Sequence, residues 1–162
     1  MQKTESEILN AMARYCSQAE RCVYDVRKKI AAENLPQEVE KRIIDRLIRE
    51  KFLDEQRFCR YFTNDKLKFN QWGRIKIIYE FKKRHIPPEA YSEAIDAIDE
   101  SAYISTLTHL LKSKKRTTKG RSEQELFRKL CSFASSRGFE YPLIIRQLKE
   151  LLNYTDDGEY AE

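Results

Sequence analysis

The sequence predicts an all-α protein of three tandem three-helix repeats, with helix-turn-helix-like units in an elongated, curved array. Apolar residues recur every three or four positions almost throughout, which is the period of a helix packed on one face. The 162 residues include only four Gly and four Pro, too few for the many tight turns of an all-β sandwich or barrel. A helix-stop signal also recurs about every 50 residues, and this spacing is typical of stacked helical repeats.

The stop signal consists of Asn34, His85 and Gly138, which lie 51 and 53 residues apart. These residue types readily adopt the left-handed conformation that ends a helix. A large hydrophobic residue follows each one and can pack back onto the helix that has just ended. Upstream of the first and third stop signals, Ser17–Glu20 and Ser122–Glu125 both read Ser-x-x-Glu. Each predicts a capping box at the start of the helix that the stop signal ends.

These signals divide the chain into three repeats and a tail. Because three helices of about 14 residues bury only a small core, neighbouring repeats are expected to stack. The first repeat, 1–53, has helices near 5–15, 18–32 and 36–51; the second, 54–100, has helices near 55–68, 71–84 and 88–99; the third, 101–154, has helices near 101–115, 122–136 and 141–153; and an acidic tail covers 155–162.

Charge is segregated along the chain, although the formal net charge is only +5. Lys66 to Arg84 contains seven basic residues and a single acidic one, and Lys112 to Arg121 contains six basic residues and no acidic one. Such segments suit an anionic partner, and the second is expected to lie on a mobile loop between helices. The predicted contact residues are Arg74, Lys76, Lys82, Lys83, Arg84, Lys112, Lys114, Lys115, Arg116, Lys119 and Arg121.

The other chemically interesting residues have structural interpretations. Asp54 is read as a helix N-cap with Glu55 favoured by the helix dipole, and the two histidines lack metal-ligand spacing. Trp72 beside Gly73 fits a packing anchor better than a base-stacking platform. With no nucleotide-binding or nucleophile motif in the sequence, we expect neither an enzyme nor a cofactor.

The same sequence sets an expectation for location. Its four cysteines lie within apolar helical patterns and form no C-x-x-C pair, which indicates buried, reduced thiols. There is neither an apolar run long enough to span a membrane nor an apolar leader. The sequence therefore predicts a cytoplasmic protein without membrane contact.

Four segments resemble the bacterial RecX family. Phe52–Tyr61 is similar to that family's G-[FY]-L-D-D-x-R-F-A-x-x-Y junction, and Trp72–Ile86 to its G-x-x-K/R-I-x-x-x-L-x-x-K-G-I. Lys129–Phe139 resembles K-L-x-x-F-L-x-x-R-G-F, and Ser17–Glu20 matches the S-x-x-E of the first repeat. Departures are Glu55 for the second Asp, Cys22 for a core Leu and His85 for the Gly of the middle repeat.

The resemblance implies a fold and a function. RecX proteins consist of three three-helix units, bind the RecA recombinase filament on DNA, and restrain its ATP hydrolysis and strand exchange. We also expect a monomer that binds single- and double-stranded DNA weakly and without sequence specificity. An alternative stays open, in which the protein is a stand-alone DNA-binding module that places a recognition helix in the major groove. The acidic face formed by Glu89, Glu93 and Asp96 favours the filament regulator, because it would repel DNA.

Overall fold

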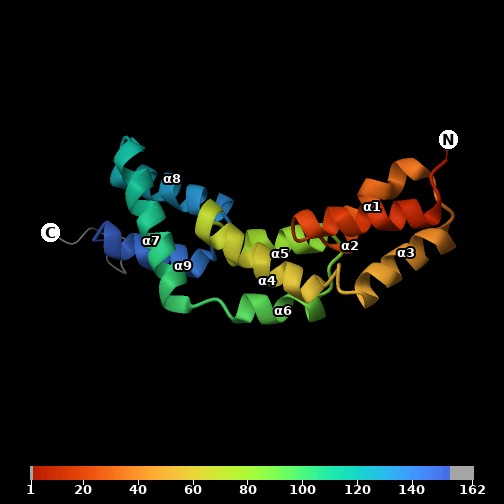
Figure 1. The fold of residues 1–162 in the computed structure, drawn as a ribbon. Coiled ribbons are helices and arrows are strands. Elements are labelled where there is room, and N and C mark those ends of the chain that lie inside the picture. Colours follow the sequence, from red (N-terminus) through yellow and green to blue (C-terminus); the bar gives the residue numbers. More distant parts are fainter. Residues whose placement is uncertain (1, 154–162) are drawn as a thin grey trace. The chain divides into compact units, whose positions relative to one another are not determined.

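The all-α prediction is confirmed in a computed structural model that describes residues 2–153 (Figure 1). Within these residues the chain forms nine α-helices, two short helical turns and no strand. The helices are α1 (Glu5–Gln18), α2 (Val23–Ile30), α3 (Gln37–Arg49), α4 (Glu55–Asp65), α5 (Arg74–Lys83), α6 (Pro88–Asp96), α7 (Glu100–Thr117), α8 (Glu123–Ser136) and α9 (Tyr141–Leu151), with a 3₁₀ turn at Ala31–Glu33 and a π turn at Lys66–Asn70. The predicted acidic tail, 155–162, lies outside the described residues, and the division into three repeats stays a prediction.

All three predicted stop residues adopt the left-handed conformation, with φ of 50° at Asn34, 57° at His85 and 93° at Gly138. At His85 the chain closes a Schellman motif, in which His85 N–H donates to the Lys82 carbonyl and Ile86 N–H to the Phe81 carbonyl, both at 3.0 Å. Gly138 ends α8 through the same pair of hydrogen bonds. The hydrophobic residues that follow His85 and Gly138 are buried.

The two Ser-x-x-Glu signals have different outcomes. Ser122 caps α8, because its hydroxyl accepts a hydrogen bond from the Glu125 N–H at 3.1 Å. The prediction for Ser17 is wrong: it lies inside α1, and its hydroxyl donates to the Ala13 carbonyl at 2.8 Å. A serine can satisfy its hydroxyl on the preceding helical turn in this way, so its presence does not force a helix to begin.

The second helix begins instead after Cys22, whose backbone N–H donates to the Asp25 carboxylate at 3.0 Å. Further left-handed residues were not expected from the sequence, and they include Lys51, with φ of 62°, and Gln71, with φ of 55°. Lys51 follows the end of α3, and Gln71 ends the π turn that continues α4. Neither residue type favours positive φ, so a local signal was missing.

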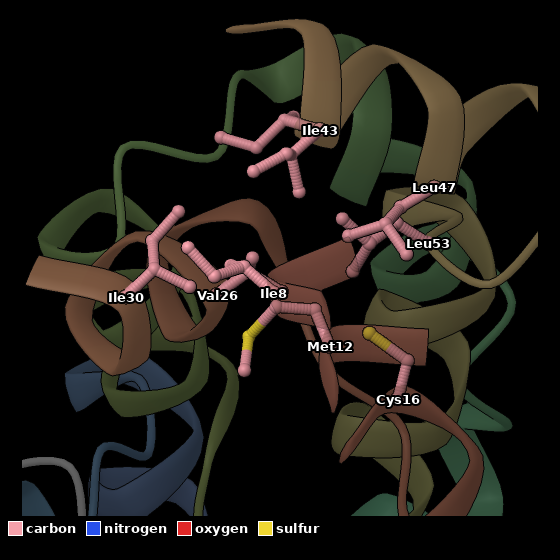
Figure 2. Packing of buried hydrophobic residues seen from close by; sticks show 9 residues of the cluster. Ile8, Met12, Cys16, Val26, Ile30, Ile43, Leu47 and Leu53 are labelled. Carbon is pink, nitrogen blue, oxygen red and sulfur yellow. The ribbon is translucent and has the colours of Figure 1, made fainter. Parts of the chain in front are cut away.

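Contacts group the described residues into two compact units, one containing 2–62 and 81–94 and the other containing 63–80 and 95–153. In the first unit, α1, α2 and α3 enclose an apolar core (Figure 2). Its members recur every three or four residues along each helix, as Ile8, Met12 and Cys16 do in α1. The remaining buried members are Val26, Ile30, Ile43, Ile44, Leu47 and Leu53.

The first unit also contains a row of aromatic rings. Phe58 contacts Phe62 with 5.6 Å between ring centroids, Phe62 contacts Phe81 at 5.3 Å, and Phe81 stacks on Tyr91 at 5.4 Å. Aromatic pairs at these distances stabilise a fold beyond the area that they bury. The row therefore joins α4, α5 and α6 within this unit.

The second unit has its own core, in which α7, α8 and α9 pack against one another. Tyr103 is a buried member of this core, and its ring contacts that of Phe139 with 5.1 Å between ring centroids. The other buried members are Leu107, Leu110, Leu111, Leu130, Ala134, Ile144 and Leu148.

Candidate functional site

Two glycines bring the turn before α5 against the turn before α9, within the second unit. Gly73 N–H donates to the Arg137 carbonyl at 2.7 Å, and Ile75 N–H donates to the Gly138 carbonyl at 3.0 Å. A Cβ atom at Gly73 would overlap the Gly138 backbone, so both positions need glycine for this approach. The contact fixes the start of α5, and with it the position of Arg74.

Arg74 is held inside a polar junction between α5, α7 and α9. Its guanidinium lies 4.0 Å from the centroid of the Tyr103 ring, and its Nη1 pairs with Glu140 Oε2 at 2.6 Å. Its Nη2 pairs with Glu100. Burial disfavours the charge of Arg74, but the hydrogen bonds to Glu140 and Glu100 outweigh burial and raise its pKa.

The Tyr103 hydroxyl completes this junction. It accepts a hydrogen bond from the Arg74 backbone N–H at 2.9 Å and donates one to Glu140. Burial and the bond to Glu140 raise the pKa of Tyr103. Two carboxylates thus compensate the single positive charge of Arg74, and this predicted contact residue stabilises the second unit.

The basic segment from Lys112 to Arg121 forms a charged end on α7. The prediction that it lies on a loop is wrong for its first four basic residues, because α7 continues to Thr117. Lys and Arg side chains do not end a helix. In its last turn they are favourable, because the C-terminal end of the helix dipole is negative and attracts cations. Only Lys119 and Arg121 lie in the connection to α8.

Most of these cations point into solvent. Lys112, Lys115, Arg116, Lys119 and Arg121 are exposed. Lys114 differs, because it is half-buried and its Nζ lies 4.7 Å from the centroid of the Phe133 ring. The connection itself is tied down by Lys129, whose Nζ donates to the Lys119 carbonyl at 2.7 Å. The five exposed residues are named the α7 basic end below.

The remaining predicted contacts fall into two places. In the first unit, Lys82 and Lys83 are exposed at the end of α5, while Arg84 is half-buried with its guanidinium 5.1 Å from the Phe62 ring. In the second unit, the Lys76 Nζ lies 4.5 Å from the Trp72 ring. Trp72 is half-buried, and the Nζ of Lys66 lies 5.1 Å from the same ring.

One aromatic residue of this segment was missed in the sequence. Phe69, in the π turn, is 70% exposed, and the Lys68 Nζ lies 5.3 Å from its ring. Its signal was the alternation of basic and apolar residues in Lys66-Leu67-Lys68-Phe69, which matches no helical stripe. The second unit therefore carries exposed cations at the α7 basic end, an exposed Lys68 beside Phe69, and two half-buried lysines, Lys66 and Lys76, beside Trp72.

The acidic residues Asp54 and Glu55 have structural roles at helix starts. Asp54 caps α4, since its Oδ1 accepts the Arg57 N–H at 3.0 Å, which confirms that prediction. Glu55 accepts a hydrogen bond from the Val23 N–H, and burial raises its pKa.

Across residues 2–153 no group of three or more potential ligands could hold a metal ion. Over the same range, no helix has the length and apolar character needed to cross a bilayer.

Comparison with known proteins identifies relatives along the whole described chain. A family model for the second three-helix domain of RecX matches residues 54–95. Regulatory protein RecX of Clostridioides difficile is 21% identical over 154 residues, covering 95% of this chain and 70% of that protein. Regulatory protein RecX of Prosthecochloris aestuarii is 28% identical over 144 residues, covering 89% and 93%. The chain is therefore similar to RecX regulatory proteins over most of its length.

Solved RecX structures share its fold. A crystal structure of regulatory protein RecX aligns with a TM-score of 0.82 at 16% identity, covering 90% of this chain and 73% of that one. RecX from Lactobacillus salivarius aligns with a TM-score of 0.78 at 17% identity, covering 91% and 96%. Some relatives are longer, and the chain spans only 62% of RecX from Clostridium tetani, to which it is 27% identical over 139 residues. The names of these relatives support a regulatory role for the family.

Proposed function

We propose that this protein is a RecX-type regulator that binds the RecA recombinase filament on DNA and restrains its ATP hydrolysis and strand exchange. The observation that carries the proposal is the family match, which extends over 95% of the chain to a protein named as a regulator. A regulator of this kind must hold a filament that presents both phosphates and protein. The segregated charges of this chain suit such a mixed partner better than they suit a small substrate.

The α7 basic end is proposed as the main phosphate contact. It presents Lys112, Lys115, Arg116, Lys119 and Arg121 to solvent, and exposed Lys and Arg side chains are the common donors to phosphate oxygens. A second phosphate contact is proposed at the end of α5 in the first unit, formed by Lys82, Lys83 and Arg84. Contacts spread over several elements make each cation contribute a salt-dependent increment, so no single one is expected to be essential.

The test measures DNA-dependent ATP hydrolysis by RecA with increasing amounts of this protein. The test variant replaces Lys112, Lys115, Arg116 and Lys119 with Ala, and keeps Lys114 because it packs over Phe133. The control variant removes the same charge from exposed positions in α1, α2 and α3: Arg14, Lys28, Lys41 and Arg49. We expect the wild type and the control to suppress hydrolysis at up to stoichiometric ratios, and the test variant to need a higher concentration.

Binding to bare DNA provides the second measurement. Removing one phosphate-binding cation should reduce the slope of log affinity against log salt by about 0.9 on duplex DNA. We expect the test variant to lose more affinity for bare DNA than for the filament, where protein contacts remain. A wild-type protein that leaves RecA hydrolysis unchanged but binds one duplex sequence tightly would favour the helix-turn-helix alternative.

A further inference from the structure

Residues 66–76 of the second unit combine aromatic rings and cations on a short, irregular stretch of chain. The π turn Lys66–Asn70 places Phe69 with 70% of its surface in water. A single exposed hydrophobic residue is common on protein surfaces and needs no explanation by itself. Here, however, an ammonium group lies near each of two rings: Lys68 by Phe69, and both Lys66 and Lys76 by Trp72.

The charges of this stretch are positive and only partly compensated. The sequence from 66 to 76 contains four basic residues and no carboxylate. Arg74 is neutralised by Glu100 and Glu140, and Lys66 lies 3.6 Å from Asp65. No ion pair among the described residues includes Lys68 or Lys76. Lys68 is exposed and Lys76 is half-buried beside Trp72, so their charges can add to the attraction of an anionic partner.

We propose that residues 66–76 form a binding site for a single strand of nucleic acid, with Phe69 as the base-stacking platform and Lys68 and Lys76 as phosphate contacts. Aromatic rings interleaved with cations are the usual means of holding an unpaired strand, because every base has a face that can stack. A duplex keeps its base faces covered by neighbouring base pairs and cannot use Phe69. This site deepens the proposed function and rests on it, since a recombinase filament is assembled on DNA.

The site carries its own reporter, because Trp72 is the only tryptophan of the chain. A labelled (dT)15 strand is titrated with the full protein in the absence of RecA, while Trp72 emission and label anisotropy are both followed. We expect saturable binding that changes Trp72 emission, and weaker binding of a 15-base-pair duplex. Phe69→Ala should weaken (dT)15 binding by at least about fivefold, as expected for the loss of one base–ring stack.

Three variants separate stacking from other contacts. The double variant Lys68→Ala and Lys76→Ala should reduce the salt slope on single strands by about 1.4, since each phosphate contact contributes about 0.7. Phe69→Leu keeps an apolar side chain without a ring and should bind as weakly as Phe69→Ala. Tyr61→Ala removes an aromatic residue of similar exposure, 63%, from the first unit and should bind like the wild type.

Several outcomes would overturn the site. These are (dT)15 binding that leaves Trp72 emission unchanged, wild-type affinity in Phe69→Ala, or restored affinity in Phe69→Leu, which would indicate an apolar protein contact. Running (rU)15 in parallel shows which sugar is preferred, and binding of either strand through Phe69 supports the site. A wild-type protein that restrains RecA but does not bind (dT)15 would reject this site alone, whereas a wild-type protein that binds (dT)15 through Phe69 but leaves RecA unrestrained would reject the proposed function.

Discussion

At the scale of single residues, several helix ends are held in the left-handed conformation by residues with side chains, among them the ends of α3 and α5. Lys51 after α3 has φ of 62°, and His85 after α5 has φ of 57°. An L-residue in this conformation costs about 1–2 kcal/mol relative to right-handed backbone. His85 has partial compensation, because its ring lies 6.2 Å from that of Tyr24. Lys51 is exposed and is the clearer case of strain.

Lys51→Gly is therefore expected to stabilise the first unit by about 1 kcal/mol, because glycine adopts positive φ without steric cost. The hydrogen bonds of this turn, such as Phe52 N–H to the Leu47 carbonyl at 2.9 Å and Arg57 Nη1 to the Lys51 carbonyl at 3.2 Å, do not use the Lys51 side chain and remain. The gain should appear as a higher urea midpoint in circular dichroism. Lys51→Ala is the control and should show no gain, since alanine keeps the strain. An unchanged midpoint in Lys51→Gly would mean that the left-handed turn stores no strain.

At the scale of elements, the second unit depends on one polar junction as well as on its apolar core. Arg74 of α5, Tyr103 of α7 and Glu140, which precedes α9, come from three parts of the chain. Their hydrogen bonds are linked, since the Tyr103 hydroxyl accepts one from the Arg74 backbone N–H and donates one to Glu140. Buried polar networks of this kind stabilise a fold only while every member has a partner.

Tyr103→Phe should destabilise the second unit by about 1–3 kcal/mol, because it leaves the Arg74 N–H and a Glu140 oxygen without their partner. The ring, which is 2% exposed, is retained, so the loss is confined to the hydroxyl. Urea unfolding followed by Trp72 emission measures the effect, since Trp72 belongs to the same unit. Tyr141→Phe is the matched control, because it removes the same hydroxyl group from a residue of the same unit that is 62% exposed. Equal stability of both variants would contradict the role of this junction.

At the scale of the whole molecule, the chain has two units whose cores can be followed separately through their thiols. Cys16, Cys22 and Cys59 are buried in the first unit, whereas Cys131 of the second unit is partly exposed. Burial raises the pKa of Cys22 and Cys59 to about 12 each. Because the thiolate is the reactive form, such thiols are nearly inert at neutral pH.

With iodoacetamide at pH 8, we expect Cys131 to be alkylated first and the other three cysteines only as the first unit opens. Peptide mass spectrometry across a urea series then reports the opening of this unit residue by residue. Protein unfolded in urea is the control and should label all four cysteines at similar rates. Native labelling of Cys59 as fast as that of Cys131 would show that the first unit is not packed around α4.

Much of this protein was determined by its sequence alone. The helical period, the left-handed residues Asn34, His85 and Gly138, and the caps at Asp54 and Ser122 all depend on preferences within a few neighbouring positions. Backbone sterics and capping bonds act over that range, so a local pattern is sufficient to predict them. The same local signals, in order along the chain, also carried the resemblance to the RecX family.

Only the tertiary structure decided which charged and aromatic residues are available to a partner. Arg74 resembles its basic neighbours in the sequence, but it pairs with Glu100 and Glu140, which lie 26 and 66 residues away. Phe69 resembles a core residue, yet the π turn leaves it in water. The ion pairs of Arg74 and the exposure of Phe69 depend on what the folded chain brings near, because the strength of an ion pair and the burial of a ring are set by neighbours in space, which here are distant in sequence.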